Sequence, residues 1–379
     1  MTLKNNTLKL FIKFIYIVIL SSFSFKSFAL DIDAREYILL DYQTWTVLKE
    51  KNSEQQMPPS SMSKLMTAYM LFEAIHSGAI SLDDYFVVSE NAWRKGGAAS
   101  GGSTMFLEPK SRVRVEDLLR GIIIQSGNDA CIVVAENMFG TEESFAIEMT
   151  ERGIEIGLTG SNFTNATGLP DPDHYMTAKD LAHLARKIIK DFPEYYSLYQ
   201  EREFTYNNIK QYNRNPLLKI TGGGDGLKTG HTNIAGYGLT GSAIRDERRL
   251  VLVANGMKTP KIRSNETSKL MDWGFRNFTN KNLFRQGETV TNADVWLGTS
   301  TSIPLILDEN VSVTIPRQAW RTLDVKVVYL GPIPAPISEG QKVAKLIIDG
   351  EKMSPLEYDL FAANSIDKLG FFKKIKAAA

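Results

Sequence analysis

Three runs decide the fold: residues 226–231, GLKTGH, residues 237–244, YGLTGSAI, and residues 248–257, RRLVLVANGM. Apolar and polar or small residues alternate along them, and this period of two predicts three successive β-strands. Asp246 and Glu247 lie between the last two runs, which indicates a tight turn and an antiparallel pair. The main domain therefore ends in an antiparallel sheet.

The residues before this sheet predict a mixture of strands and helices. Residues 37–52, YILLDYQTWTVLKEKN, are typical of two strands around a polar turn. Apolar residues then recur at helical spacing in four runs, 63–75, 115–124, 129–139 and 181–189. Thr177 and Asp180 have the form of a capping box before the last of these runs. We therefore expect an α/β (α+β) domain over residues 30–285.

The pattern changes after this domain. Residues 286–352 consist of short alternating runs broken by Gly, Pro and Asp, which predicts a small all-β, sandwich-like domain. Residues 353–379 end in a segment that combines Leu369, Phe371, Phe372 and Ile375 with four lysines, Lys368, Lys373, Lys374 and Lys376. This composition indicates an amphipathic tail on a membrane surface, although Gly370 interrupts the helical pattern and leaves a solvated, frayed terminus as the alternative.

The first 29 residues have the form of a secretory signal. Lysines without acidic residues precede the apolar run FIYIVILSSFSF, and small residues at Ser27 and Ala29 suit signal-peptidase cleavage. An uncleaved anchor helix is the alternative, but the apolar run is short for a bilayer span and contains serines. We expect cleavage near Ala29 and a periplasmic protein attached peripherally to the inner membrane.

Charge and cysteine content narrow the function classes. Removal of residues 1–29 takes away four lysines and no acid, so 44 basic and 43 acidic residues become 40 and 43. A slightly acidic mature chain argues against nucleic acid as a partner. Cys131 is the single cysteine, so no disulfide forms within the chain, and its apolar run CIVVA indicates a buried small residue.

Ser61 and Lys64 form the first candidate pair for catalysis. Pro58 and Pro59 precede a helix start, and residues three apart on a helix share a face, so the Lys64 amine is placed to accept the Ser61 proton if it is held neutral. The Ser-x-x-Lys pattern alone is weak, because Ser365 and Lys368 also match it. The start of a helix adds an exposed backbone N–H that can face an oxyanion.

Two further motifs lie downstream. Ser126-Gly127-Asn128 connects two apolar helices, where either polar side chain is expected to serve as a helix cap or as a functional group. Lys228-Thr229-Gly230 lies inside a predicted strand, where the glycine indicates either a bulge or the close approach of a ligand or backbone.

The three motifs, in this order and on a helix, a connector and a strand, are the motif set of penicillin-binding proteins and serine β-lactamases. The surrounding strings PPSSMSKLMTAY, GGSTMFLEP, GIIIQSGNDACIVVAE and GLKTGHTNIAGYGLTGSA resemble the D-alanyl-D-alanine carboxypeptidases, the low-molecular-mass penicillin-binding proteins, from about Ile32 to Asp349. The resemblance implies a β-lactamase/DD-peptidase-like antiparallel sheet flanked by helices, with the site between the sheet and a mainly helical part.

The resemblance also implies roles for single residues. Ser61 is expected to be the acylated nucleophile, Lys64 its general base, and Ser126 a proton relay to the leaving D-alanine. The residues expected to bind substrate are Asn128, Lys228, Thr229, Gly230, His231 and Arg249. In this scheme Lys228 lowers the Lys64 pKa, Thr229 and Arg249 bind the terminal carboxylate, and the backbone N–H groups of Ser61 and His231 form the oxyanion hole.

The implied reaction removes the terminal D-alanine from peptidoglycan stem peptides ending in D-Ala-D-Ala, with β-lactams as inhibitors. A class A β-lactamase is a rival, but residues 163–177, FTNATGLPDPDHYMT, offer Asp171 and Asp173 and no glutamate for deacylation. A catalytically silent envelope protein is a second rival. The four histidines form no i, i+4 metal pair and no Gly-x-Ser-x-Gly elbow occurs, so we expect no metal and no cofactor.

Overall fold

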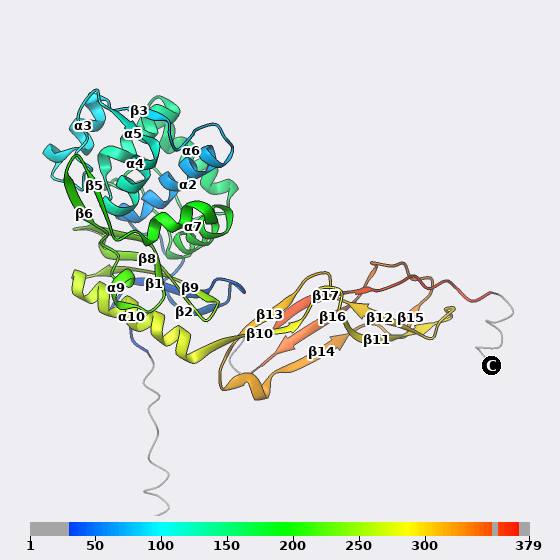
Figure 1. The fold of residues 1–379 in the computed structure, drawn as a ribbon. Helices are drawn as coiled ribbons and strands as arrows, with labels where there is room; N and C mark the ends of the chain where they lie inside the picture. Colours follow the sequence, from blue (N-terminus) through cyan, green and yellow to red (C-terminus); the bar gives the residue numbers. More distant parts are fainter. Residues whose placement is uncertain (1–29, 351–354, 371–379) are drawn as a thin grey trace, which may run out of the picture. The chain divides into compact units, whose positions relative to one another are not determined.

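The computed structural model describes residues 30–350 and 355–370. A five-stranded antiparallel sheet, with the order β2-β1-β9-β8-β7, forms the centre of the larger domain (Figure 1). Its strands are β1 (Glu36–Asp41), β2 (Val47–Lys51), β7 (Gly224–Thr232), β8 (Gly236–Arg245) and β9 (Arg248–Met257). The predicted antiparallel strands and the turn at Asp246 and Glu247 are therefore confirmed.

Helices cover both faces of this sheet. On one face, α10 (Pro260–Asn277) packs so closely that a Cβ on Gly274 would lie 2.6 Å from Leu39 and 2.8 Å from Leu250. On the other face, Ile38 and Val251 belong to a buried cluster that also contains residues of the helical part. Because neighbouring residues of a strand point to opposite faces, a sheet covered on both sides needs nearly continuous apolar strands.

The helical part contains the four helices predicted from apolar spacing and one that was not predicted, α6 (Glu142–Glu155). The predicted ones are α2 (Lys64–His76), α4 (Val115–Arg120), α5 (Asn128–Phe139) and α7 (Ala178–Asp191). The Thr177 side chain caps α7 by accepting a hydrogen bond from the Asp180 backbone N–H, as predicted. The shorter elements of the domain are β3 (Tyr85–Val87), α3 (Glu90–Gly96), β4 (Arg112–Arg114), α8 (Pro193–Tyr196), β5 (Glu203–Tyr206), β6 (Ile209–Tyr212) and α9 (Leu217–Ile220).

The carboxyl-terminal part is all-β. A six-stranded sheet has the order β14-β16-β17-β12-β11-β15, and β10 pairs with β13 in a second sheet. The strands are β10 (Phe278–Phe284), β11 (Thr289–Trp296), β12 (Ser302–Ile306), β13 (Val311–Pro316), β14 (Asp324–Val328), β15 (Ile333–Pro334), β16 (Lys342–Asp349) and β17 (Leu356–Ala362). Their inward residues form a second apolar core.

The predicted limits of this domain were wrong at both ends. It begins at Phe278 rather than at residue 286, because β10 follows α10 without a loop. It also includes β17, which lies within the tail predicted from residue 353 onward. Leu360 and Ala362 of this strand alternate inward and are buried in the domain. Phe371, Phe372 and Ile375 of the expected tail, and the expected signal at residues 1–29, lie outside the described residues. No helix in the described ranges has the length and apolar run needed to cross a bilayer.

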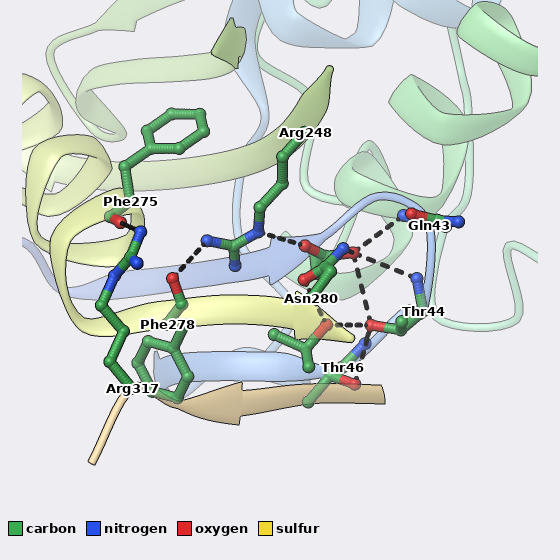
Figure 2. Close-up of polar contacts among 10 residues, drawn as sticks. Gln43, Thr44, Thr46, Arg248, Phe275, Phe278, Asn280 and Arg317 are labelled. Carbon is green, nitrogen blue, oxygen red and sulfur yellow. Dashed lines mark hydrogen bonds and ion pairs between the residues drawn. The ribbon is translucent and has the colours of Figure 1, made fainter. Parts of the chain in front are cut away.

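Gln43, Arg248 and Asn280, from segments far apart in the sequence, meet in one polar network (Figure 2). Its centre is Asp41, at the end of β1. Its Oδ1 accepts hydrogen bonds from the backbone of Gln43 and Thr44 and from the Asn280 amide, at 3.0, 3.1 and 3.0 Å. Its Oδ2 pairs with Arg248 Nε at 2.9 Å. Since the Asp41 side chain is fully buried, these contacts replace the hydrogen bonds that its oxygens would make to water.

Candidate active site

Ser61 lies on the single 3₁₀ turn, Ser60–Ser63, that leads into α2. Strand β7 passes directly beside this turn: a Cβ on Gly230 would lie 2.9 Å from the Pro59 carbonyl oxygen and 3.1 Å from Met62. The strand glycine is therefore explained by the close approach of a backbone, and the only irregularity of the β7–β8 register lies instead at Gly224–Gly226.

The Lys64 amine lies beneath Ser61 and has three acceptors. Its Nζ is 2.9 Å from Ser61 Oγ and 2.7 Å from Asn128 Oδ1, and it also donates to the Thr167 carbonyl oxygen. Lys64 is 1% exposed, and burial lowers its pKa to about 8. Because the Asn128 and Thr167 oxygens cannot donate, they take the two N–H bonds of a neutral amine and leave its lone pair for the Ser61 proton.

The connector supplies Ser126 next to this pair. Residues 121–125 form a π-helical turn after α4, and Ser126 follows with a left-handed backbone at a φ of 61°. Lys228 Nζ on β7 donates to Ser126 Oγ at 2.9 Å. Helix α5 has Gly127 as its N-cap and no side-chain cap hydrogen bond, so the alternative that Ser126 or Asn128 serves as a cap is contradicted.

Both buried lysines have lowered pKa values. Burial is the largest cause for each, and for Lys228 the neighbouring Lys64 and Arg214 cations add to it. Arg214 also lowers the Lys64 pKa, and because repulsion between two cations is mutual, the Lys64–Lys228 pair acts in the direction that the sequence predicts. Desolvation is thus the main physical route to a neutral base here.

A cleft of about 660 Å³ opens over these residues. Its lining residues are Ser61, Gly101, Gly102, Ser103, Ser126, Asn128, Thr167, Gly168, Leu169, Arg214, Thr229, Gly230, His231, Thr232, Tyr237, Pro260 and Arg263. The structure therefore brings together every predicted site residue except Arg249, with Lys64 and Lys228 buried beneath the cleft. Ser365 and Lys368, which match the first motif, lie in an extended segment of the all-β domain.

Arg249 is not in the cleft. It lies opposite Ile244 on β8, whereas Thr229 lies opposite Leu239, five residues away on the same strand. At about 3.4 Å per residue this separation is roughly 17 Å. The hairpin does return Arg249 toward β7, but to the beginning of that strand, where its guanidinium pairs with Asp225 at 2.6 Å. The expected contact of Arg249 with the substrate carboxylate is contradicted by this register.

Two arginines that the sequence analysis missed lie in the cleft instead. Arg214 Nη1 donates to Ser103 Oγ at 2.7 Å. Arg263, in the first turns of α10, is 9% exposed, contacts the Tyr237 ring through its guanidinium at 5.6 Å, and has no hydrogen-bond partner for its buried Nε among the described residues. Neither position is conspicuous in the sequence: Arg214 follows Tyr212 and Asn213, and Arg263 lies in a helix with many charged residues.

The cleft therefore concentrates positive charge. In the part of the chain that the structure describes, Lys64, Lys228, Arg214 and Arg263 form no ion pair with a carboxylate, whereas Arg248 and Arg249 do. Strand β7 is also the edge strand of its sheet, so every second backbone N–H along it points away from β8 and is available to another group. A serine nucleophile, a neutral amine and unpaired cations in one cleft suit acyl transfer from an anionic peptide.

The comparisons with known proteins agree with this geometry. The family model for D-alanyl-D-alanine carboxypeptidase matches residues 24–259. The chain belongs to the D-alanyl-D-alanine carboxypeptidase family. It is accordingly a serine peptidase, and residues 278–368 match the model for the C-terminal domain of penicillin-binding protein 5.

Individual relatives cover nearly the whole chain. D-alanyl-D-alanine carboxypeptidase DacC of Escherichia coli K12 is 39% identical over 91% of this chain and 87% of its own length. A crystal structure of penicillin-binding protein 5 from Haemophilus influenzae has a TM-score of 0.81 at 35% identity, over 90% of this chain and 99% of that one. Penicillin-binding protein D2 of Listeria monocytogenes, solved in an ampicillin-bound form, has a TM-score of 0.56 at 29% identity, over 65% of this chain and 99% of that one.

The loop that would carry a deacylating acid in a class A β-lactamase has a different role in this family member. Asp171 and Asp173 do not line the cleft, and Asp171 lines a separate pocket with Pro170 and His174. The group that the loop presents to Lys64 is the Thr167 carbonyl. A carbonyl oxygen cannot accept and return the proton of a hydrolytic water as a carboxylate does.

Proposed function

We propose that the protein removes the terminal D-alanine from peptidoglycan stem peptides ending in D-Ala-D-Ala through a Ser61 acyl-enzyme. The observation that carries the proposal is the Lys64 amine, which is buried, has a lowered pKa and lies 2.9 Å from Ser61 Oγ. Its two other contacts, Asn128 Oδ1 and Thr167 O, are fixed acceptors, so they direct the lone pair to the Ser61 hydroxyl.

Acylation transfers the Ser61 proton to Lys64 as Oγ attacks the carbonyl carbon of the penultimate D-alanine. The negative charge on the carbonyl oxygen is stabilised by the backbone N–H groups of Ser61 and His231. The C–N bond then breaks, and the leaving amine takes a proton through Ser126, which Lys228 contacts at 2.9 Å. Water then attacks the ester, and Ser61 regains its proton.

Recognition of the terminal carboxylate is assigned to Thr229, Arg214 and Arg263. All three line the cleft, and neither arginine has a carboxylate partner among the described residues. An anion in a partly desolvated cleft needs charge-assisted donors, which a guanidinium already paired with Asp225 does not offer. In the proposed scheme these two arginines, and not Arg249, bind the substrate carboxylate.

β-Lactams are proposed as inhibitors that acylate Ser61 and stay bound, since the loop beside Lys64 presents a carbonyl and no acid to the cleft. We also propose that the mature protein acts in the periplasm. Attachment to the inner membrane through the lysine-rich tail rests on the sequence of residues 353–379 alone.

The test is to incubate the protein lacking residues 1–29 with a pentapeptide ending in D-Ala-D-Ala and to measure free D-alanine. The expected result is release of one D-alanine per peptide, blocked by prior treatment with penicillin. A silent binding protein would release none. Rapid turnover of penicillin itself would instead show a β-lactamase.

A further inference from the structure

The loop that contacts Lys64 is organised by one side chain, Asn165. Its Oδ1 accepts hydrogen bonds from Thr167 N at 3.1 Å, Thr167 Oγ1 at 2.8 Å, Gly168 N at 2.8 Å and Leu169 N at 3.2 Å. Its Nδ2 donates to the Leu169 carbonyl at 3.1 Å and to Thr164 Oγ1 at 3.3 Å. One amide therefore binds both ends of the turn that carries the Thr167 carbonyl.

The turn is also fixed from outside. The Ala166 N–H donates to Glu142 Oε1 at 3.2 Å, and the Ala166 carbonyl accepts from Thr67 Oγ1 at 2.7 Å. Gly168 has a φ of +75°, and a Cβ there would lie 2.0 Å from the Ser60 carbonyl oxygen. The turn therefore lies in close contact with the segment that carries Ser61.

This arrangement has a consequence for Lys64. Thr167 O and Asn128 Oδ1 are the two acceptors that orient the neutral amine, and only the second comes from a recognised motif. If the Thr167 carbonyl rotates away, one N–H of Lys64 is free to turn toward Ser61 Oγ, and the lone pair then points away from the proton that it must take.

We propose that Asn165 is a positioning residue, which fixes the Thr167 carbonyl against Lys64 and so directs the lone pair of the base toward Ser61. The inference rests on the proposed function, because it assigns to Asn165 an effect on the general base of that reaction. Asn165 acts through the backbone of Thr167 and does not itself touch the nucleophile.

Asn165→Ala tests the proposal against a matched control. The control is Asn162→Ala: Asn162 belongs to the same loop, is similarly half-buried, and its amide donates to the Asp173 carbonyl, away from Lys64. The measurements are the second-order rate of Ser61 acylation by penicillin and the pH profile of kcat/KM for the pentapeptide. Because small displacements of reacting groups are costly, the rate at the pH plateau should fall about 10- to 100-fold in Asn165→Ala and remain at the wild-type level in Asn162→Ala.

The pH profile separates positioning from stability. A hydrogen-bond acceptor favours the protonated amine, so its loss lowers the Lys64 pKa and moves the acid limb of the profile to lower pH. Asn165→Asp, which keeps the oxygen acceptor, should restore most of the plateau rate. If Asn165→Ala lowers thermal stability but keeps the wild-type plateau and acid limb, Asn165 is a structural residue only and the proposal is overturned.

A second pair of variants tests the proposal if Asn165→Ala does not fold. If Asn165→Ala is not soluble, Asn165→Asp is compared with Asn165→Ser, whose shorter side chain can hold fewer N–H groups of the turn. The proposal requires slower acylation and a lower acid limb for the serine variant, and equal values for the two would contradict it. Absence of both D-alanine release and penicillin labelling in the wild type would instead reject the proposed function itself.

Discussion

Two regions of the larger domain hold cations in opposite electrostatic surroundings. At the Asp41 network, Arg248 pairs with a carboxylate that is fully buried (Figure 2). The next residue, Arg249, pairs with Asp225. In the cleft, Lys64, Lys228, Arg214 and Arg263 have no such partner among the described residues. A neutralised cation holds the fold together, whereas an unpaired one keeps its capacity for a ligand or shifts its pKa. The difference separates structural arginines from functional ones more reliably than their positions in the sequence.

The largest expected effect comes from removing the base of the cleft. Lys64→Met should lower kcat/KM for the pentapeptide, and the rate of acylation by penicillin, by about 1,000-fold or more, because Ser61 loses its proton acceptor. The surrounding apolar cluster accommodates a methionine, so circular dichroism and thermal unfolding should remain close to the wild type. A variant that keeps more than a tenth of wild-type activity would show that another group is the base.

Removing one partner of the Asp41–Arg248 pair should lower the stability of the fold and leave the catalytic activity intact. Asp41→Ala leaves Arg248 buried without its partner and should lower the free energy of unfolding by about 3–5 kcal/mol in urea titrations. Below the unfolding transition, kcat/KM should stay within about twofold of wild type, since the pair makes no contact with the cleft. A large loss of kcat/KM in fully folded Asp41→Ala would remove the distinction between the two regions.

The two kinds of arginine can be compared directly. Arg263→Ala should lower kcat/KM for the acid form of the peptide, with a loss of transition-state stabilisation of about 2–3 kcal/mol. It should have little effect on kcat/KM for a peptide with an amidated C-terminus. Arg249→Ala should destabilise the fold, because Asp225 is left buried, yet keep the wild-type ratio of acid to amide turnover. The reverse pattern, with the ratio altered only by Arg249→Ala, would restore the assignment made from the sequence.

The smallest effect is a displacement of the pH profile. Lys64 acts as a base when neutral, so kcat/KM should rise with pH toward the lowered pKa of about 8. Arg214→Met removes a cation that disfavours the protonated amine, so the acid limb should move to higher pH. Because burial remains the main cause of the lowered pKa, the limb should still lie below the ordinary lysine value of 10.5. A limb that moves to lower pH would contradict the electrostatic role of Arg214.

The sequence predicted most of this site because local pattern and chemistry agree there. Ser61 and Lys64 are three residues apart across a helix start, and period-two alternation places Lys228 on a strand. The prediction for Arg249 was wrong because alternation shows which strands pair but not how far along a hairpin of two ten-residue strands a side chain lies. Arg214 and Arg263 gave no signal, since what distinguishes them is a missing partner, and partners follow from tertiary structure.

The contact between Thr167 and Lys64 was beyond sequence reasoning for a related reason. A backbone carbonyl has no residue signature, and the side chains that the loop's sequence offers as candidates are its acidic ones, Asp171 and Asp173. The boundary at β17 was missed because a strand of seven residues was merged with the lysine-rich terminus that follows it.

The measurement that tests the central claim most directly is the site of acylation. The protein is treated with penicillin, and the adduct is located by intact-mass and peptide-level mass spectrometry in wild type and in Ser61→Ala. One persistent adduct per chain on Ser61, and none in the variant, is the predicted result. An adduct on Ser60 or Ser63, or labelling of Ser61→Ala at the wild-type rate, would show that the buried lysine and unpaired cations of this cleft do not serve Ser61.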